Sequence, residues 1–147
     1  MSFVKTAYDI ARKKVFFCKT TDKISEVARI LHYNNIGSIL VKDKDKVIGI
    51  ITVNDMLRQI EKNIDTKKTI AKEIMSSPVR TARKDLEIDE LVEEFNKHKV
   101  SRMVLLDKNG EVAGVVRDIA VYKYFTFFKY DAQVKKMFAK DYVDRFY

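Results

Sequence analysis

The chain of 147 residues repeats itself with an offset of 64 positions, and this repeat limits the folds that it can adopt. The first copy has apolar residues at the i, i+3, i+4, i+7 spacing of one helix face: Ile24, Val27, Ala28 and Leu31. The second copy has the same pattern 64 positions later, at Ile88, Leu91, Val92 and Phe95. Because one such copy is small, we expect the two copies to pack on each other, with a ligand cleft between them.

Each copy predicts a lead-in helix followed by the order β-α-β-β-α, and the fold class is therefore α+β. The first copy, 7–63, predicts these elements: helix Phe3–Arg12, strand Val15–Cys18, helix Lys23–Asn34, a hairpin of Ile36–Val41 and Val47–Ile51, and a helix from Val53. The second copy, 64–124, predicts the matching set: Lys68–Met75, Val79–Ala82, Glu87–Lys97, Val100–Leu106 with Val112–Val116, and a helix from Asp118. We expect the two repeats to be related by a pseudo-twofold axis.

The C-terminal segment lies outside the repeat, and we expect residues 125–147 to form a helical extension. Residues 122–147 hold ten of the sixteen aromatic residues, a density that has to be buried somewhere. One interpretation is packing onto the repeats or across a dimer. The alternative is a docking surface for a partner protein or nucleic acid.

The composition favours a cytoplasmic, globular protein without a membrane span. Hydrophobic residues make up 46% and charged residues 34% of the chain, and no apolar run approaches the ~20 residues that cross a bilayer. The single cysteine, Cys18, lies in an apolar run and is expected to be a buried thiol. The net charge of +8 would attract polyanions, but the lysines are scattered, which is more typical of a solvated surface than of a nucleic-acid interface.

The sequence gives little support to catalysis, so we expect no enzymatic activity, no catalytic residue and no metal site. Paired-cysteine or histidine metal spacings and a nucleophile elbow are absent, and four glycines in all exclude a glycine-rich phosphate loop. The segment Gly49–Asp55 stands out at a strand-to-helix junction, where free N–H groups suit a phosphate and a carboxylate suits ribose hydroxyls. Thr52 and Asp55 fit an N-cap and its capping-box partner equally well, which requires no ligand.

The whole pattern resembles a tandem pair of cystathionine-β-synthase (CBS) domains over about Ala7 to Tyr124. The likeness depends on the Gly-hydrophobic-hydrophobic-Thr-x-x-Asp segment that closes the first copy and on Met75–Val79, which opens the second. The resemblance implies a module that binds adenosine-containing ligands (AMP, ADP, ATP, sometimes S-adenosylmethionine or NAD) between the repeats, with no cofactor required. It also implies a composite site, in which Thr and Asp come from one repeat and the base pocket from the other.

Carried over to this chain, the resemblance implies one complete site. Thr52 would contact phosphate and Asp55 the ribose, while Arg102 could also reach phosphate. The other residues implied at this site are Gly37, Ser38, Ile50, Asn54, Val79, Thr81, Val100 and Ser101.

The second site departs from the family pattern at three positions. Arg117 replaces the expected Thr or Ser, Ala120 replaces the Asp, and Phe17 replaces the residue equivalent to Thr81. We expect this site to be degenerate and closed by Phe17 and Arg117, with Asp118 capping its helix. A site of altered preference, in which Arg117 holds phosphate, is the alternative.

The sequence therefore favours a regulatory or sensor module that binds one adenine nucleotide per chain. The resemblance implies a homodimer, and a regulated partner protein of unknown identity would read the ligand-bound state. Two other classes stay open: a basic nucleic-acid-binding protein, and a structural scaffold with both clefts closed.

Overall fold

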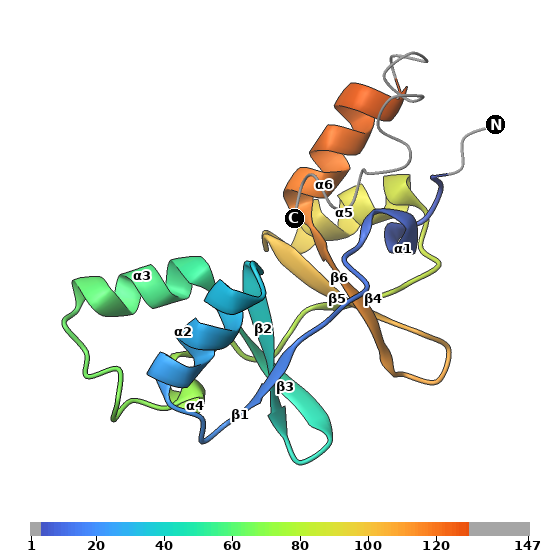
Figure 1. Cartoon of the computed structure of the whole chain (residues 1–147). Helices are drawn as coiled ribbons and strands as arrows, with labels where there is room; N and C mark the ends of the chain where they lie inside the picture. The colour runs from blue at the N-terminus through green and yellow to red at the C-terminus, as the bar shows by residue number, and fades with distance from the viewer. Residues whose placement is uncertain (1–3, 130–147) are drawn as a thin grey trace. The chain divides into compact units, whose positions relative to one another are not determined.

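The computed structural model describes residues 4–129, which divide into two compact units (Figure 1). One unit is the continuous segment Val15–Val79. The other combines the described residues before it, up to Lys14, with those that follow from Arg80. The second unit is therefore assembled from two separate stretches of chain.

The continuous unit holds β1 (Phe17–Lys19), α2 (Ile24–Tyr33), β2 (Ser38–Asp43), β3 (Lys46–Thr52), α3 (Val53–Glu61) and α4 (Ala71–Ile74). The discontinuous unit holds α1 (Ala7–Ile10), β4 (Thr81–Arg83), α5 (Ile88–His98), β5 (Arg102–Leu106), β6 (Val112–Arg117), α6 (Asp118–Lys123) and a π-helical stretch, η1 (Tyr124–Lys129). The predicted α+β class and the order of elements in each repeat are confirmed.

Each unit contains a three-stranded sheet with the same topology. The strand orders are β1-β2-β3 and β4-β5-β6, with the first pair parallel and the second antiparallel in both sheets. Each hairpin has a register shift at the same place, after Val41 in β2 and after Leu105 in β5. The longer second turn ends at Gly110, whose φ of +78° favours glycine. Its extra residue increases the offset between the two repeats from 64 to 65 positions after this turn, as between Gly49 and Gly114.

The apolar helix stripes that the sequence reveals form the two cores. In the continuous unit, Ile24, Val27 and Leu31 of α2 are at most 4% exposed and pack with Ile39, Val41 and Ile51 of the sheet. In the other unit the equivalent cluster joins α5, the sheet and α6. Burying a side chain of this size stabilises the fold by about 1.5–3 kcal/mol, so these stripes dominate the stability of each unit.

The lead-in segments differ from the prediction, because each is a single helical turn that packs in the unit of the other repeat. Ala7 and Ile10 are fully buried with α5 and β6, whereas Ala71 lies in the core with α2. After α1 the chain becomes extended, and Arg12 exchanges two backbone hydrogen bonds of 2.9 Å with Val115.

The same pairing recurs after α4, where Ser76 and Ile50 exchange backbone hydrogen bonds of 2.9 and 3.0 Å. These pairings end both lead-in helices earlier than predicted. The strands that follow, β1 and β4, begin two residues later than predicted, at Phe17 and Thr81.

The predicted C-terminal extension begins as a continuation of α6, since η1 carries the helix to Lys129. The rest of the expected extension, residues 130–147, lies outside the described residues. Of the helices that the structure describes, none is both long and apolar enough to cross a membrane.

Gly114 of β6 and Gly49 of β3 allow the lead-in segments to approach these strands, and the two glycines should differ in their tolerance of a methyl group. A Cβ at Gly114 would lie 2.8 Å from the backbone oxygen of Arg12, whereas at Gly49 it would overlap the side chain of Met75. We predict that Gly114→Ala costs about 1–3 kcal/mol of unfolding free energy by overpacking, and Gly49→Ala clearly less, because a methionine side chain can move. Urea denaturation of both variants measures the difference, and equal costs would contradict this view of the close approach.

Candidate functional site

The candidate site is built where β3 passes into α3. Thr52 is the last residue of β3 and the N-cap of α3, and it is paired with Ser38 at the start of β2. The N–H of Val53 donates to the carbonyl of Gly37 at 3.0 Å, which fixes the first turn of α3 against the start of the neighbouring strand. The junction therefore holds Gly37, Ser38, Thr52 and Asp55 together.

Asp55 is held in place by its own helix cap. Its Oδ2 accepts hydrogen bonds from the Thr52 N–H at 2.8 Å and from the Thr52 hydroxyl at 2.9 Å. Its own N–H donates to Thr52 Oγ1 at 3.2 Å, so that the capping box is complete. The local interpretation of this pair is thus confirmed, and it leaves Oδ1 as the carboxylate oxygen outside the cap.

Arg58 is a neighbour that the sequence analysis did not single out. Its Nη1 lies 3.4 Å from Asp55 Oδ1, in an i, i+3 pair on α3. The arginine side chain is 53% exposed and that of the aspartate 11% exposed. The 3.4 Å distance between Nη1 and Oδ1 is long for a hydrogen bond, and solvent reaches the arginine. A ligand hydroxyl could therefore share Asp55 Oδ1 with Arg58 or take its place. The i+3 spacing from Asp55 is the signal that could have identified it.

The other predicted residues of this unit lie around the same junction or further along the chain. Ile50 is in β3 and bridges to Ser76, while Asn54 is exposed on the first turn of α3. Val79 is the final residue of the continuous unit.

The remaining predicted residues belong to the discontinuous unit. Thr81 begins β4 and is paired with Val104 of β5. Val100, Ser101 and Arg102 lead into β5, where the carbonyl of Ser101 accepts a 3.0 Å hydrogen bond from the N–H of Asp118. This contact is the counterpart of the Gly37–Val53 bond, so the two junctions share one backbone design.

The second junction has the backbone of the first without its polar side chains. Arg117 is the N-cap of α6, and its side chain forms no capping hydrogen bond. Ala120, at the position of Asp55, is fully buried in the apolar core. Asp118 is not the N-cap that the sequence predicted, because it is the first helical residue, and its Oδ1 accepts from the adjacent Ile119 N–H at 2.7 Å.

Phe17 and Cys18 of β1 have ordinary structural surroundings. Phe17 is 37% exposed, and Lys42 Nζ lies 3.9 Å from the centroid of its ring, a cation–π contact. Cys18 is buried, and desolvation, followed by the charge of Asp22, raises the pKa of its thiol to about 11. The thiol is therefore protonated at neutral pH. Among residues 4–129, no group of three or more His, Cys, Asp or Glu side chains could hold a metal ion.

Comparison with known proteins identifies the family of this fold. Residues 7–62 and 71–126 each match the CBS domain family, so the chain belongs to it, with two copies of the domain. The uncharacterized protein MK0525 of Methanopyrus kandleri is 33% identical over 110 residues, which cover 74% of this chain and 56% of that protein. A second uncharacterized protein, MJ1232 of Methanocaldococcus jannaschii, is 32% identical over 74% of this chain and 35% of its own length. The chain thus spans about half of the first relative and a third of the second.

The solved structures that resemble this chain are CBS domain pairs. The CBS domain pair of protein MJ0100, in complex with 5-methylthioadenosine and S-adenosyl-L-methionine, has a TM-score of 0.71 and 27% identity. The match covers 84% of this chain and 97% of that one. A signal-transduction protein with CBS domains from Burkholderia ambifaria matches with a TM-score of 0.70 and 22% identity over 82% of this chain and 88% of that one, which supports the fold.

The cap at the site can be tested on stability alone. We predict that Thr52→Ala lowers the unfolding free energy of the Val15–Val79 unit by about 0.5–2 kcal/mol, because the Asp55 N–H loses its acceptor. Thr52→Ser keeps the hydroxyl and should stay within a few tenths of a kcal/mol of the parent protein. Denaturant unfolding followed by circular dichroism compares the two variants. An equal loss in both would show that the methyl group of Thr52, and not its hydroxyl, matters.

Proposed function

We propose that the chain is a regulatory module that binds one adenosine-containing ligand, with AMP, ADP or ATP favoured and S-adenosylmethionine as a further candidate. The ligand would bind in the cleft between the repeats. Thr52 and Asp55 would contact the phosphate and ribose, and Thr81 and Arg102 would contribute from the other repeat. No chemistry is required of these residues, because their role is to bind and orient the ligand.

The burial of Asp55 is the observation that carries this proposal. Among residues 4–129 it is the one buried polar or charged residue, at 8% exposure, while the equivalent position in the second repeat is an alanine. Removing a carboxylate from water costs free energy, which a helix cap repays in part. An exposed acidic residue would cap the helix equally well, so the buried position is better explained by a ligand that Oδ1 contacts.

The related CBS pair of MJ0100 supports the class of ligand. The structure of that protein contains two adenosine-containing molecules, and its match to this chain covers 97% of its length. Both ligands carry a ribose and an adenine, which are the groups that Asp55 and the pocket around Thr81 would recognise. The phosphate preference of this chain depends on its own residues, Thr52 and Arg102.

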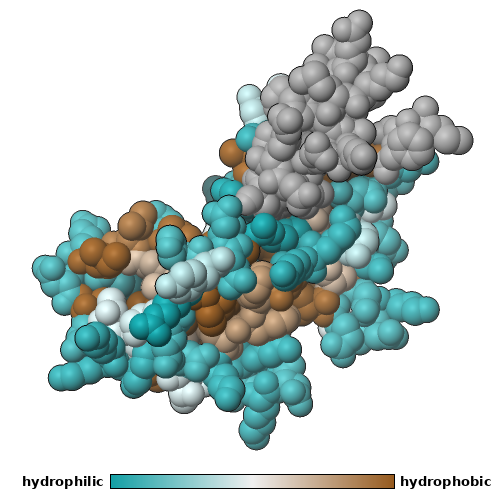
Figure 2. Space-filling model, viewed as in Figure 1, coloured by the Kyte–Doolittle hydropathy of each residue, from teal (hydrophilic) through white to brown (hydrophobic). Residues whose placement is uncertain are grey.

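Self-association of the chain has support from an exposed apolar stripe on α3. Val53, Leu57 and Ile60 follow the i, i+4, i+7 spacing and are 42%, 58% and 61% exposed. Figure 2 shows hydrophobic residues on the surface over α3, in contrast with the hydrophilic end of the hairpin of β2 and β3 below it. We infer a homodimer that buries this stripe, and a regulated protein that reads the ligand-bound state of the module.

Nucleic-acid binding is the second candidate, and one observation favours it. Lys13 and Lys84 both place their ammonium groups over the ring of Tyr8, at 4.7 and 4.9 Å from its centroid. A paired cation and aromatic ring could contact a phosphate backbone and a base. Binding to DNA or RNA that weakens steeply with salt would favour this second candidate.

Asp55→Ala should weaken nucleotide binding by about ten- to a hundredfold, because a charged acceptor for ribose hydroxyls contributes roughly 1.5–3 kcal/mol. Isothermal titration with AMP, ADP, ATP and S-adenosylmethionine measures this effect. The substitution also removes a helix cap, so a control must separate the two roles.

Asp9 provides the matched control, since it forms the same type of cap on α1. Asp9 Oδ2 accepts from the Thr6 N–H at 2.8 Å and the Thr6 hydroxyl at 3.0 Å. Burial raises the pKa of Asp9, but hydrogen bonds from Lys5 and Thr6 and the charge of Lys13 outweigh it and hold the pKa below its ordinary value. Asp9→Ala should therefore cost stability at neutral pH without changing nucleotide affinity. Equal affinity in both variants would leave Asp55 as a helix cap only.

The number of ligands per chain tests the interpretation of the second junction. Because Ala120 offers no ribose acceptor and Arg117 no capping hydroxyl, calorimetric titration should saturate at one ligand per chain. Saturation at two equivalent ligands would mean that Arg117 binds phosphate in a second working site.

A further inference from the structure

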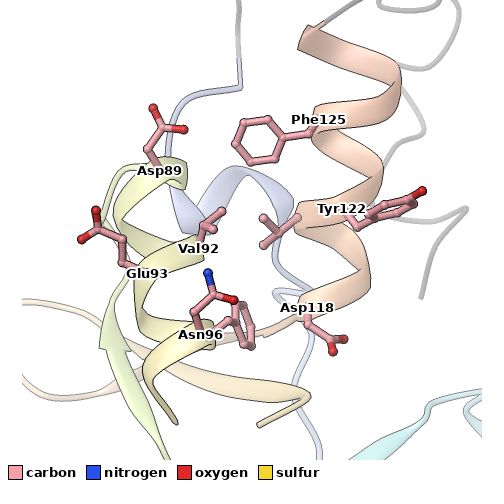
Figure 3. A pocket seen from close by; sticks show the side chains of 9 residues that line it. Asp89, Val92, Glu93, Asn96, Asp118, Tyr122 and Phe125 are labelled. Atoms are coloured by element: carbon pink, nitrogen blue, oxygen red, sulfur yellow. The ribbon is translucent and has the colours of Figure 1, made fainter. Parts of the chain in front are cut away.

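An apolar groove with an acidic edge lies between α5 and α6 (Figure 3). Its volume is about 510 Å³. Val92 and Phe125 point toward each other across it, and Asp89 and Glu93 lie along the outer side of α5. The full lining is Asp89, Val92, Glu93, Phe95, Asn96, Asp118, Val121, Tyr122 and Phe125. None of these described residues is basic, although the chain as a whole carries a net charge of +8.

The groove leaves apolar and acidic groups without a cover among the described residues. Tyr122 is 70% exposed and Ile119, on the same helix, is 37% exposed. Within residues 4–129, no basic side chain forms an ion pair with Asp89 or Glu93. An apolar surface with this edge fits an occupant that is apolar on one side and basic on the other.

The chain supplies a segment of that chemistry a few residues further on. Residues 133–140 contain Lys135, Lys136 and Lys140 and no acidic residue. Val134, Met137 and Phe138 have the i, i+3, i+4 spacing of one helix face. The segment would thus offer an apolar side to the groove and ammonium groups to its acidic edge.

The length of the connection is compatible with this occupant. The described chain ends at Lys129, at the end of η1, and Phe125 of the same stretch already lines the groove. Three residues, 130–132, separate Lys129 from the segment. Antiparallel helix–helix connections in compact domains commonly use about 2–8 residues. We propose that residues 133–140 bind in the groove between α5 and α6 of their own chain, independently of any nucleotide.

A tryptophan introduced by Phe138→Trp can report this contact in the full-length protein, because the natural chain has no tryptophan. We expect blue-shifted emission and low acrylamide quenching that do not change on dilution. Val92→Glu in the groove and, separately, the charge reversal Glu93→Lys on its edge should raise the quenching severalfold. Circular dichroism checks that each variant is folded, and Glu93→Lys, an exposed position, keeps the test valid if Val92→Glu fails to fold.

Leu57→Glu is the matched control, since it places a charge on the exposed stripe of α3 and should leave the emission unchanged. The proposal is overturned if the tryptophan of the Phe138→Trp protein, with no other substitution, is solvent-exposed. It is also overturned if Leu57→Glu has the same effect as the groove variants, because the segment would then bind elsewhere. Emission that shifts with protein concentration would assign the contact to a second copy and would overturn binding within one chain.

Discussion

The structure depends on two pairs of backbone hydrogen bonds that join segments far apart in the sequence. Arg12 pairs with Val115 and Ser76 pairs with Ile50, and in each case the second residue lies in the edge strand of a three-stranded sheet. The glycines beside them, Gly114 and Gly49, leave room for the incoming backbone or for Met75. Because each lead-in segment is tied to the sheet of the other repeat, the units that fold together are not the units that repeat in the sequence.

The sequence was sufficient for the elements whose causes are local. The stripes of α2 and α5 have the helical period, and the observed bounds lie within one residue of those predicted. The ends of α1 and α4 could not be predicted in the same way, because they depend on hydrogen bonds to strands that lie elsewhere in the chain. The membership of Ala7 in the core of α5 has the same non-local origin.

The candidate site shows a similar limit. The Thr-x-x-Asp pattern predicted the capping box at Thr52 and Asp55, but Thr6 and Asp9 form nearly the same box in a place with no proposed ligand. What distinguishes them is burial, which depends on the packing around the first turn of α3. The acidic groove of α5 and α6 likewise arises from side chains that come together only in the folded unit, whereas the pair of Asp55 and Arg58 is local to one helix turn of α3.

The discontinuous unit also imposes an order on folding while the chain is being synthesised at the ribosome. Once residue 79 has emerged, the Val15–Val79 unit has all of its strands and can fold, as domains commonly do during translation. Ala7 and Ile10 are made before that unit, but they cannot be covered until Leu91 and Val116 have been added. The apolar side chains of α1 therefore stay uncovered while the residues up to Val116 are made, so they reach their final environment after residues that follow them in the chain.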